Sequence, residues 1–156
     1  AEGRLILADA LAYASELNPM LVLETSTLTG SAKNALGKHA IAAMSSSAEK
    51  YMPLLTECGK DVYERLVEFP LWEEYGEMIK SDIADIKNIG GSEAGIITAG
   101  KFLEAFTNYP FIHLDIAGVS FLQSNDHYRP KGGTGTGVRL LYRFIIQLAE
   151  EKKSNR

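Results

Sequence analysis

The chain has 156 residues, of which 46% are hydrophobic and 23% are charged, and its formal net charge is −4. These values are typical of one folded globular domain. No cluster of basic residues is present, so we expect neither nucleic acid nor a membrane surface as a partner. The longest apolar stretches are too short to span a membrane, and the single cysteine, Cys58, cannot form an intramolecular disulfide. The expected location is therefore cytoplasmic.

Helices and strands alternate along the first third of the chain. A Leu- and Ala-rich segment predicts a helix that ends at Asn18-Pro19, and a short apolar run then predicts a buried strand. Small hydroxyl residues follow as a loop closed by Gly30. The predicted helices here cover residues 5–17 and 31–36, and the predicted strands cover residues 20–23 and 39–44.

In the remainder of the chain, the region 48–69 carries apolar residues three or four positions apart, which predicts helix. Pro53 and Gly59 predict its division into two helices. Further helices are predicted over residues 72–80, 96–106 and 138–153, and a strand over residues 111–116. The strands are apolar with little polar alternation, which is typical of a buried sheet. The predicted fold is an α/β three-layer sandwich, with a mainly parallel or mixed sheet and helices on both faces.

The glycine-rich segment 132–137 suggests a phosphate-binding loop, since closely spaced glycines let backbone N–H groups approach an anion. Its spacing departs from both nucleotide motifs: Val138 stands where each requires another residue. The alternative interpretation is a tight loop that leads into the last helix. The sequence favours this alternative, and nucleotide binding remains a weaker hypothesis.

His113 and Asp115 share one face of the strand predicted at residues 111–116. Such a pair suits a metal ion or a general base with its orienting carboxylate, but buried pairs of this kind are more often satisfied core hydrogen bonds. The sequence favours the structural role. It contains no Gly-x-Ser-x-Gly motif, and its three histidines are scattered, so a serine-hydrolase triad is not indicated.

Six segments together resemble the catalytic domain of the leucyl aminopeptidases, also called cytosol aminopeptidases. They occur in the family's order over essentially the whole chain, which makes the resemblance specific. The segments are AEGRLILADAL at 1–11, TSTLTGSAKNALG at 25–37, IKSDIADIKNIGG at 79–91, AGIITAGKFLEAF at 94–106, HLDIAG at 113–118 and PKGGTGTGVRLL at 130–141.

The resemblance implies a role for seven residues. Glu2 corresponds to a carboxylate that bridges two divalent metal ions, zinc or manganese, and Arg4 to the arginine that holds a bicarbonate ion acting as general base. Bridging oxygen ligands suit paired cations, and the arginine fork suits a small planar oxyanion. The expected wall of the substrate pocket consists of Thr27, Leu28, Gly30, Ala117 and Ser120.

The resemblance also implies peptide substrates and a homohexamer for the intact enzyme. The family's other metal ligands, a lysine and three aspartates, would precede Ala1, and the chain begins inside the metal-binding signature. We therefore expect residues 1–156 to be the C-terminal portion of the catalytic domain, truncated at its N-terminal side and inactive alone, because one carboxylate cannot hold two cations. The alternative from another functional class is a non-catalytic α/β assembly module.

Overall fold

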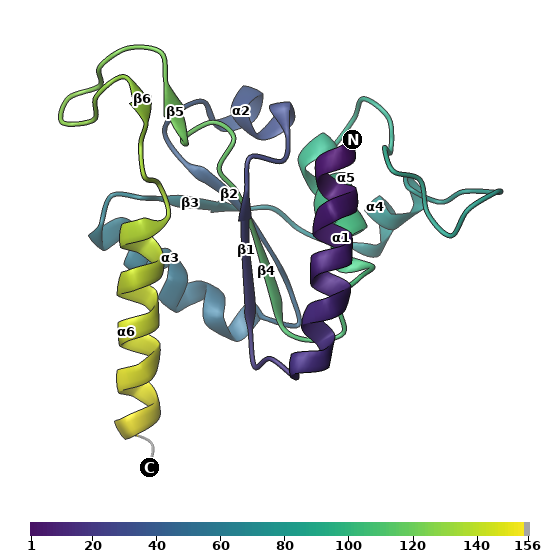
Figure 1. Ribbon diagram of the computed structural model, residues 1–156, viewed down its shortest axis with the longest axis horizontal. Coiled ribbons are helices and arrows are strands. Elements are labelled where there is room, and N and C mark those ends of the chain that lie inside the picture. Colours follow the sequence, from purple (N-terminus) through teal and green to yellow (C-terminus); the bar gives the residue numbers. More distant parts are fainter. Residues whose placement is uncertain (155–156) are drawn as a thin grey trace.

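A computed structural model of the chain, which describes residues 1–154, contains a four-stranded sheet at its centre (Figure 1). The order of the strands is β1 (Val22–Ser26), β4 (Phe111–Asp115), β2 (Ile41–Ser46) and β3 (Leu66–Glu68). β1 runs parallel to β4, and β2 runs parallel to β3, whereas β2 and β4 are antiparallel. The sheet is therefore mixed, and each half of it is parallel.

Helices cover both faces of this sheet (Figure 1). On β4, Phe111 packs with apolar residues of α1 (Glu2–Ala14) and α5 (Gly95–Glu104). The next residue, Ile112, points to the opposite face and packs with residues of α3 (Met52–Asp61) and α6 (Val138–Ser154). Successive side chains of β4 thus enter two apolar cores, one on each face of the sheet. This arrangement confirms the three-layer α/β sandwich predicted from the sequence.

Smaller elements complete the fold. The hairpin that pairs β5 with β6 lies outside the main sheet, and α2 follows β1 directly. These elements are α2 (Gly30–Leu36), α4 (Glu73–Glu77), β5 (Phe121–Leu122), β6 (Gly132–Gly133) and the two 3₁₀ turns η1 (Ser15–Leu17) and η2 (Glu49–Tyr51). No helix among residues 1–154 has the length and apolar character needed to cross a membrane.

The region 48–69 is where the sequence prediction was wrong. It forms one helix, α3, and its last residues form strand β3 instead of a second helix. Pro53 lies in the first turn of α3, where its missing N–H costs nothing. Gly59 lies inside the helix, and a Cβ there would come within 2.6 Å of the Glu64 carbonyl oxygen. The glycine therefore permits a close backbone approach and does not end the helix.

Strand boundaries also differ from the prediction. β1 extends from Val22 to Ser26, beyond the predicted residues 20–23, because every one of its residues pairs with β4. The predicted helix 72–80 is reduced to α4, and the hairpin of β5 and β6 was not predicted. For β1 and for the β5–β6 hairpin, pairing with residues outside the segment decides the structure, and local periodicity carries no information about such contacts.

Candidate functional site

Three segments of the predicted site gather at one end of the sheet. β1 and β4 are parallel, so the chain leaves both strands at the same edge, through residues 27–30 and residues 117–120. The first turn of α1, which carries Glu2 and Arg4, lies at this same end of the molecule (Figure 1). The carboxyl ends of parallel strands are the usual place for a binding site in an α/β fold.

Arg4 is a buried cation that has no carboxylate partner within the described residues 1–154. Its side chain is 7% exposed, and its Nη1 donates a hydrogen bond of 2.5 Å to the carbonyl oxygen of Asn88. The guanidinium carbon lies 5.8 Å from the ring centroid of Phe102. Within residues 1–154 the buried Nε finds no hydrogen-bond acceptor, and burial lowers the pKa of the guanidinium. An unpaired, desolvated guanidinium of this kind favours the binding of a small oxyanion.

Glu2 lies in the first turn of α1, and its side chain is exposed. The part of the chain that the structure describes contains no cluster of three or more His, Cys, Asp or Glu side chains suited to a metal ion. A single exposed carboxylate does not hold two cations against water. Glu2 can therefore supply one ligand to a metal site, and the described residues do not complete that site.

The loop at residues 27–30 is held in place by Thr29. The Thr29 side chain caps α2, accepting a hydrogen bond of 3.0 Å from the N–H of Ala32. Its hydroxyl and its backbone N–H both donate to Oδ2 of Asp115, at 2.7 and 3.0 Å. Two of the predicted pocket residues, Thr27 and Gly30, are exposed on either side of this anchor. Leu28 packs against the apolar cluster of α1 and α5.

Asp115 also fixes the second segment of the site. Its other carboxylate oxygen, Oδ1, accepts a hydrogen bond of 3.1 Å from the N–H of Ala117. Ser120 is half-buried and its carbonyl oxygen accepts a hydrogen bond of 2.9 Å from the N–H of Thr134. One buried carboxylate thus joins the segments that carry all five predicted pocket residues. The sequence placed Asp115 correctly in a structural role but gave no sign of these partners.

His113 has a separate structural partner. Its Nδ1 contacts the Glu24 carboxylate across the β1–β4 pair, where the two residues are directly opposite in register. His113 is fully buried and Glu24 is 9% exposed. His113 and Asp115 therefore bind different residues, as the structural interpretation predicts for this strand. Nε2 of His113 and Oε1 of Glu24, however, have no hydrogen-bond partner among the described residues, so this pair is only partly satisfied.

The glycine-rich loop is closed by a carboxylate of the chain itself. Oε2 of Glu64 accepts hydrogen bonds from the N–H groups of Gly137 and Leu140, at 3.1 and 3.0 Å, and so caps the start of α6. These are the donors that a phosphate group would use at a helix N-terminus. The structure favours the tight-loop interpretation over nucleotide binding. Glu64, in an unremarkable turn between α3 and β3, was not singled out by the sequence.

Comparison with known proteins shows the family to which the chain is similar. The family model described as "Cytosol aminopeptidase family, catalytic domain" matches residues 1–142. The chain is 47% identical over 146 residues to a probable cytosol aminopeptidase of Geobacter sulfurreducens, covering 93% of the chain and 29% of the relative. It is 49% identical over 150 residues to one of Desulfotalea psychrophila, covering 95% of the chain and 30% of the relative. The chain thus spans less than a third of these relatives.

Two solved structures share the fold. The bottromycin maturation enzyme BotP superimposes with a TM-score of 0.90 at 31% identity, covering 96% of this chain and 34% of that protein. A mutant of tomato leucine aminopeptidase superimposes with a TM-score of 0.85 at 34% identity, covering 94% of this chain and 28% of that protein. Both similarities extend over almost the whole chain, so they include the sheet end at which the candidate site lies.

Proposed function

Because the chain belongs to the cytosol aminopeptidase family, we propose that it forms part of an enzyme that releases N-terminal amino acids, leucine among them, from peptides. The observation that carries the proposal is the family match over residues 1–142, within which Glu2, Arg4 and the two loops tied by Asp115 lie at one end of the sheet. The similarity to the tomato leucine aminopeptidase supports a leucine-type specificity. The names of the curated relatives support a cytoplasmic location.

In this proposal, Glu2 contributes one ligand to a pair of zinc or manganese ions, and ligands from outside residues 1–156 complete the site. The metal pair, when bound, polarises the peptide carbonyl and activates water. Arg4 holds a bicarbonate ion beside the metals. The fit of the bicarbonate rests on the unpartnered Nε of Arg4 and on the absence of a competing carboxylate among the described residues.

The wall of the substrate pocket in this proposal consists of the two loops at the sheet end. Thr27, Leu28 and Gly30 come from the loop after β1, and Ala117 and Ser120 come from the turn after β4. The hydrogen bonds that the Asp115 carboxylate accepts from Thr29 and Ala117 hold the two segments at a fixed separation. A preorganised wall of this kind orients the first side chain of a peptide without an additional entropic cost at binding.

Residues 1–156 alone are inactive in this proposal, and the intact enzyme assembles as a homohexamer. The family supports the proposed hexamer, and the lack of a complete metal cluster among the described residues supports the proposed inactivity. The competing proposal, a non-catalytic assembly module, would retain the fold and the oligomer but would show no turnover.

The test compares two proteins made from the same gene: residues 1–156 alone and the full-length gene product that contains them. We expect manganese- or zinc-dependent release of leucine from a leucine amide by the full-length protein, loss of that activity with a chelator, and no turnover by residues 1–156. Turnover by residues 1–156 would contradict the assignment of metal ligands to other parts of the protein. A full-length protein without metal-dependent turnover would support the assembly module.

A further inference from the structure

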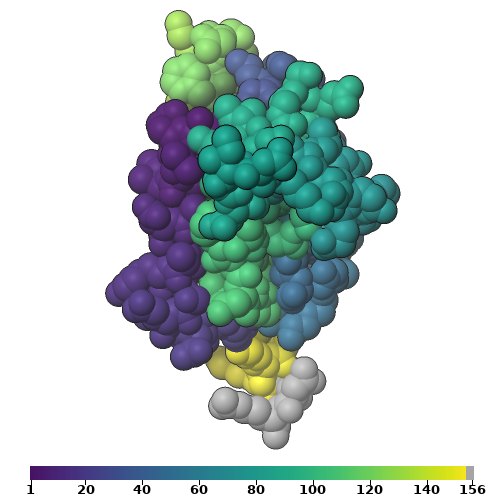
Figure 2. All heavy atoms as spheres, turned by 90° about the vertical axis from the view of Figure 1, so that its right-hand side faces the viewer, coloured from purple at the N-terminus to yellow at the C-terminus, as the bar shows by residue number. Residues whose placement is uncertain are grey.

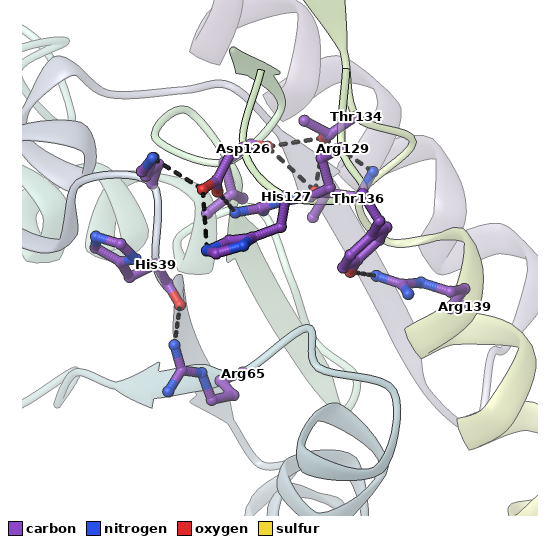
Figure 3. A network of polar contacts seen from close by, with 11 residues as sticks. His39, Arg65, Asp126, His127, Arg129, Thr134, Thr136 and Arg139 are labelled. Carbon is purple, nitrogen blue, oxygen red and sulfur yellow. Dashed lines mark hydrogen bonds and ion pairs between the residues drawn. The ribbon is translucent and has the colours of Figure 1, made fainter. Parts of the chain in front are cut away.

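A second concave site lies away from Glu2 and Arg4, on the side of the molecule where the β5–β6 hairpin loop folds over the start of β2 (Figure 3). It is a cavity of about 110 Å³ between residues 38–41, residues 63–65 and parts of the segment 119–139. None of the seven residues of the proposed aminopeptidase site lines it. A cavity of this size takes a small ion or molecule and is too small for a drug-sized ligand.

The charges that line this cavity are predominantly positive. The side chains of Lys38, Arg65, Arg129 and Arg139 face two carboxylates, those of Glu64 and Asp126, which leaves two positive charges in excess. The chain as a whole carries a net charge of −4, so this local excess opposes the overall balance. Clustered cations in a concave surface concentrate anions there.

Both carboxylates are already occupied by partners in the chain. Asp126 forms ion pairs with Arg129 and with Lys38, and the hydrogen bonds from these two groups hold the pKa of Asp126 below its usual value. Glu64 caps α6 and accepts a further hydrogen bond of 3.2 Å from Nε of Arg139. Neither carboxylate is therefore left to neutralise another cation of the cavity.

Arg65 is the cation that lacks a counter-charge. Its Nη2 donates to the carbonyl oxygen of His39 at 3.3 Å, and its guanidinium carbon lies 4.6 Å from the ring centroid of Tyr63. Among residues 1–154, no carboxylate forms an ion pair with Arg65. Figure 3 shows Arg65, His39 and His127 around the same space, with Arg139 at its far side. The guanidinium of Arg65, an exposed residue at the rim of the cavity, is thus oriented by neutral contacts, and no carboxylate among the described residues pairs with it.

The backbone around the cavity is held in an unusual conformation at two places. Tyr63 and His127 both line the cavity and have φ angles of +57° and +53°. Tyrosine rarely adopts this left-handed region, whereas histidine enters it more readily, and a bulky residue stays there where surrounding contacts impose it. Thr134 and Thr136, which also line the cavity, both donate hydrogen bonds to the carbonyl oxygen of Val119, at 2.7 and 3.2 Å. The walls are therefore formed before any ligand arrives.

We propose that this cavity binds a small, doubly charged oxyanion of the phosphate type, with Arg65 as its principal ligand. Planar guanidinium groups donate paired hydrogen bonds to such anions, and a dianion matches the two charges in excess. The anion comes either as free phosphate or as the terminal phosphate of a small phosphomonoester. The volume of the cavity favours free phosphate.

The experiment is calorimetric titration of the folded chain with inorganic phosphate, with sodium chloride at the same ionic strength as the blank. A second titration uses glycerol phosphate to distinguish a free anion from an ester. We expect saturable binding of inorganic phosphate, with weaker binding of the ester. An ester that binds more tightly would overturn the assignment of free phosphate, and the absence of saturable binding of either ligand would overturn the site.

Variants localise the binding. Arg65→Gln should weaken phosphate binding about tenfold, because a charge-assisted hydrogen bond is lost. Asp126→Asn removes a negative charge from the lining of the cavity and should strengthen phosphate binding several-fold. Arg143→Gln is the matched control. Arg143 lies one turn after Arg139 in α6 and pairs with Asp61, and neither residue lines the cavity. Far-ultraviolet circular dichroism checks that each variant is folded. Equal weakening by Arg65→Gln and Arg143→Gln, or no effect of Arg65→Gln, would overturn the proposal.

Discussion

The start of α6 and the start of α1 satisfy their polar groups in opposite ways. At the glycine-rich loop before α6, the carboxylate of Glu64 accepts the hydrogen bonds of Gly137 and Leu140. At the first turn of α1, which Figure 2 shows in purple at the molecular surface, Nε of Arg4 is buried without an acceptor among the described residues, and Oδ1 of Asn88 likewise has no donor. The glycine-rich loop, which is the more conspicuous motif in the sequence, thus has its N–H groups at the start of α6 satisfied within the chain. The first turn of α1 has a buried polar group that is not satisfied by the described residues.

This difference concerns the groups at the two helix starts that still lack a partner among the described residues. Buried polar groups in folded proteins almost always have partners, and an exception calls for a bound molecule or a functional reason. The backbone N–H groups of Gly137 and Leu140 at the start of α6 need no ligand, because the Glu64 carboxylate accepts their hydrogen bonds. The start of α1 fits an added oxyanion, which is the role that the family resemblance gives to Arg4. Substitutions in the two regions test this contrast.

The largest expected effect concerns Asp115, which forms the framework of the α1 side. Asp115→Ala removes the acceptor of three hydrogen bonds from Thr29 and Ala117, and Asp115 is 1% exposed. We expect a loss of about 3 kcal/mol in the free energy of unfolding, measured with urea. The control Asp61→Asn changes an exposed partner of Arg143 and should alter stability by less than about 0.5 kcal/mol. Equal effects of the two variants would contradict the role of Asp115.

The next effect tests the internal completeness of the α6 side. Glu64→Gln retains the shape of the side chain but replaces a charged acceptor by a neutral one, so that the capping of α6 weakens. The expected loss is about 2 kcal/mol in the free energy of unfolding. Glu57→Gln, at an exposed glutamate paired with Lys60, is the matched control and should be nearly neutral. A neutral Glu64→Gln would show that the carboxylate does not hold the loop.

A smaller effect is expected within the glycine-rich loop itself. Gly135 has a φ angle of +67°, and a Cβ there would meet no atom within 4 Å. Gly135→Ala should therefore cost about 1 kcal/mol through backbone strain alone. Gly133→Ala, at a glycine with equal space and no left-handed φ, should cost less. We expect no mononucleotide binding by the unchanged chain or by either variant. Binding by the unchanged chain that is lost in Gly135→Ala would restore the nucleotide hypothesis.

The sequence predicted the sandwich because the apolar strands and amphipathic helices carry local periodicities. It did not predict β3, because Leu66–Glu68 is a strand only through pairing with β2. The same limit applies to the site. Family motifs identified Arg4 and the two loops, but the tie through Asp115 and the cap by Glu64 join residues more than 70 positions apart. No spacing within a single motif carries that information.

The most direct test of the account is Arg4→Met, measured for stability and for activity. Methionine fills a similar volume without a charge, and replacing a buried cation that lacks a carboxylate partner by an apolar side chain is often close to neutral. We expect the free energy of unfolding of residues 1–156 to change by less than about 1 kcal/mol. The metal-dependent release of leucine by the full-length protein should fall by about 100-fold or more. A protein that loses several kcal/mol of stability while its full-length form retains activity would show that Arg4 serves the fold and not the reaction.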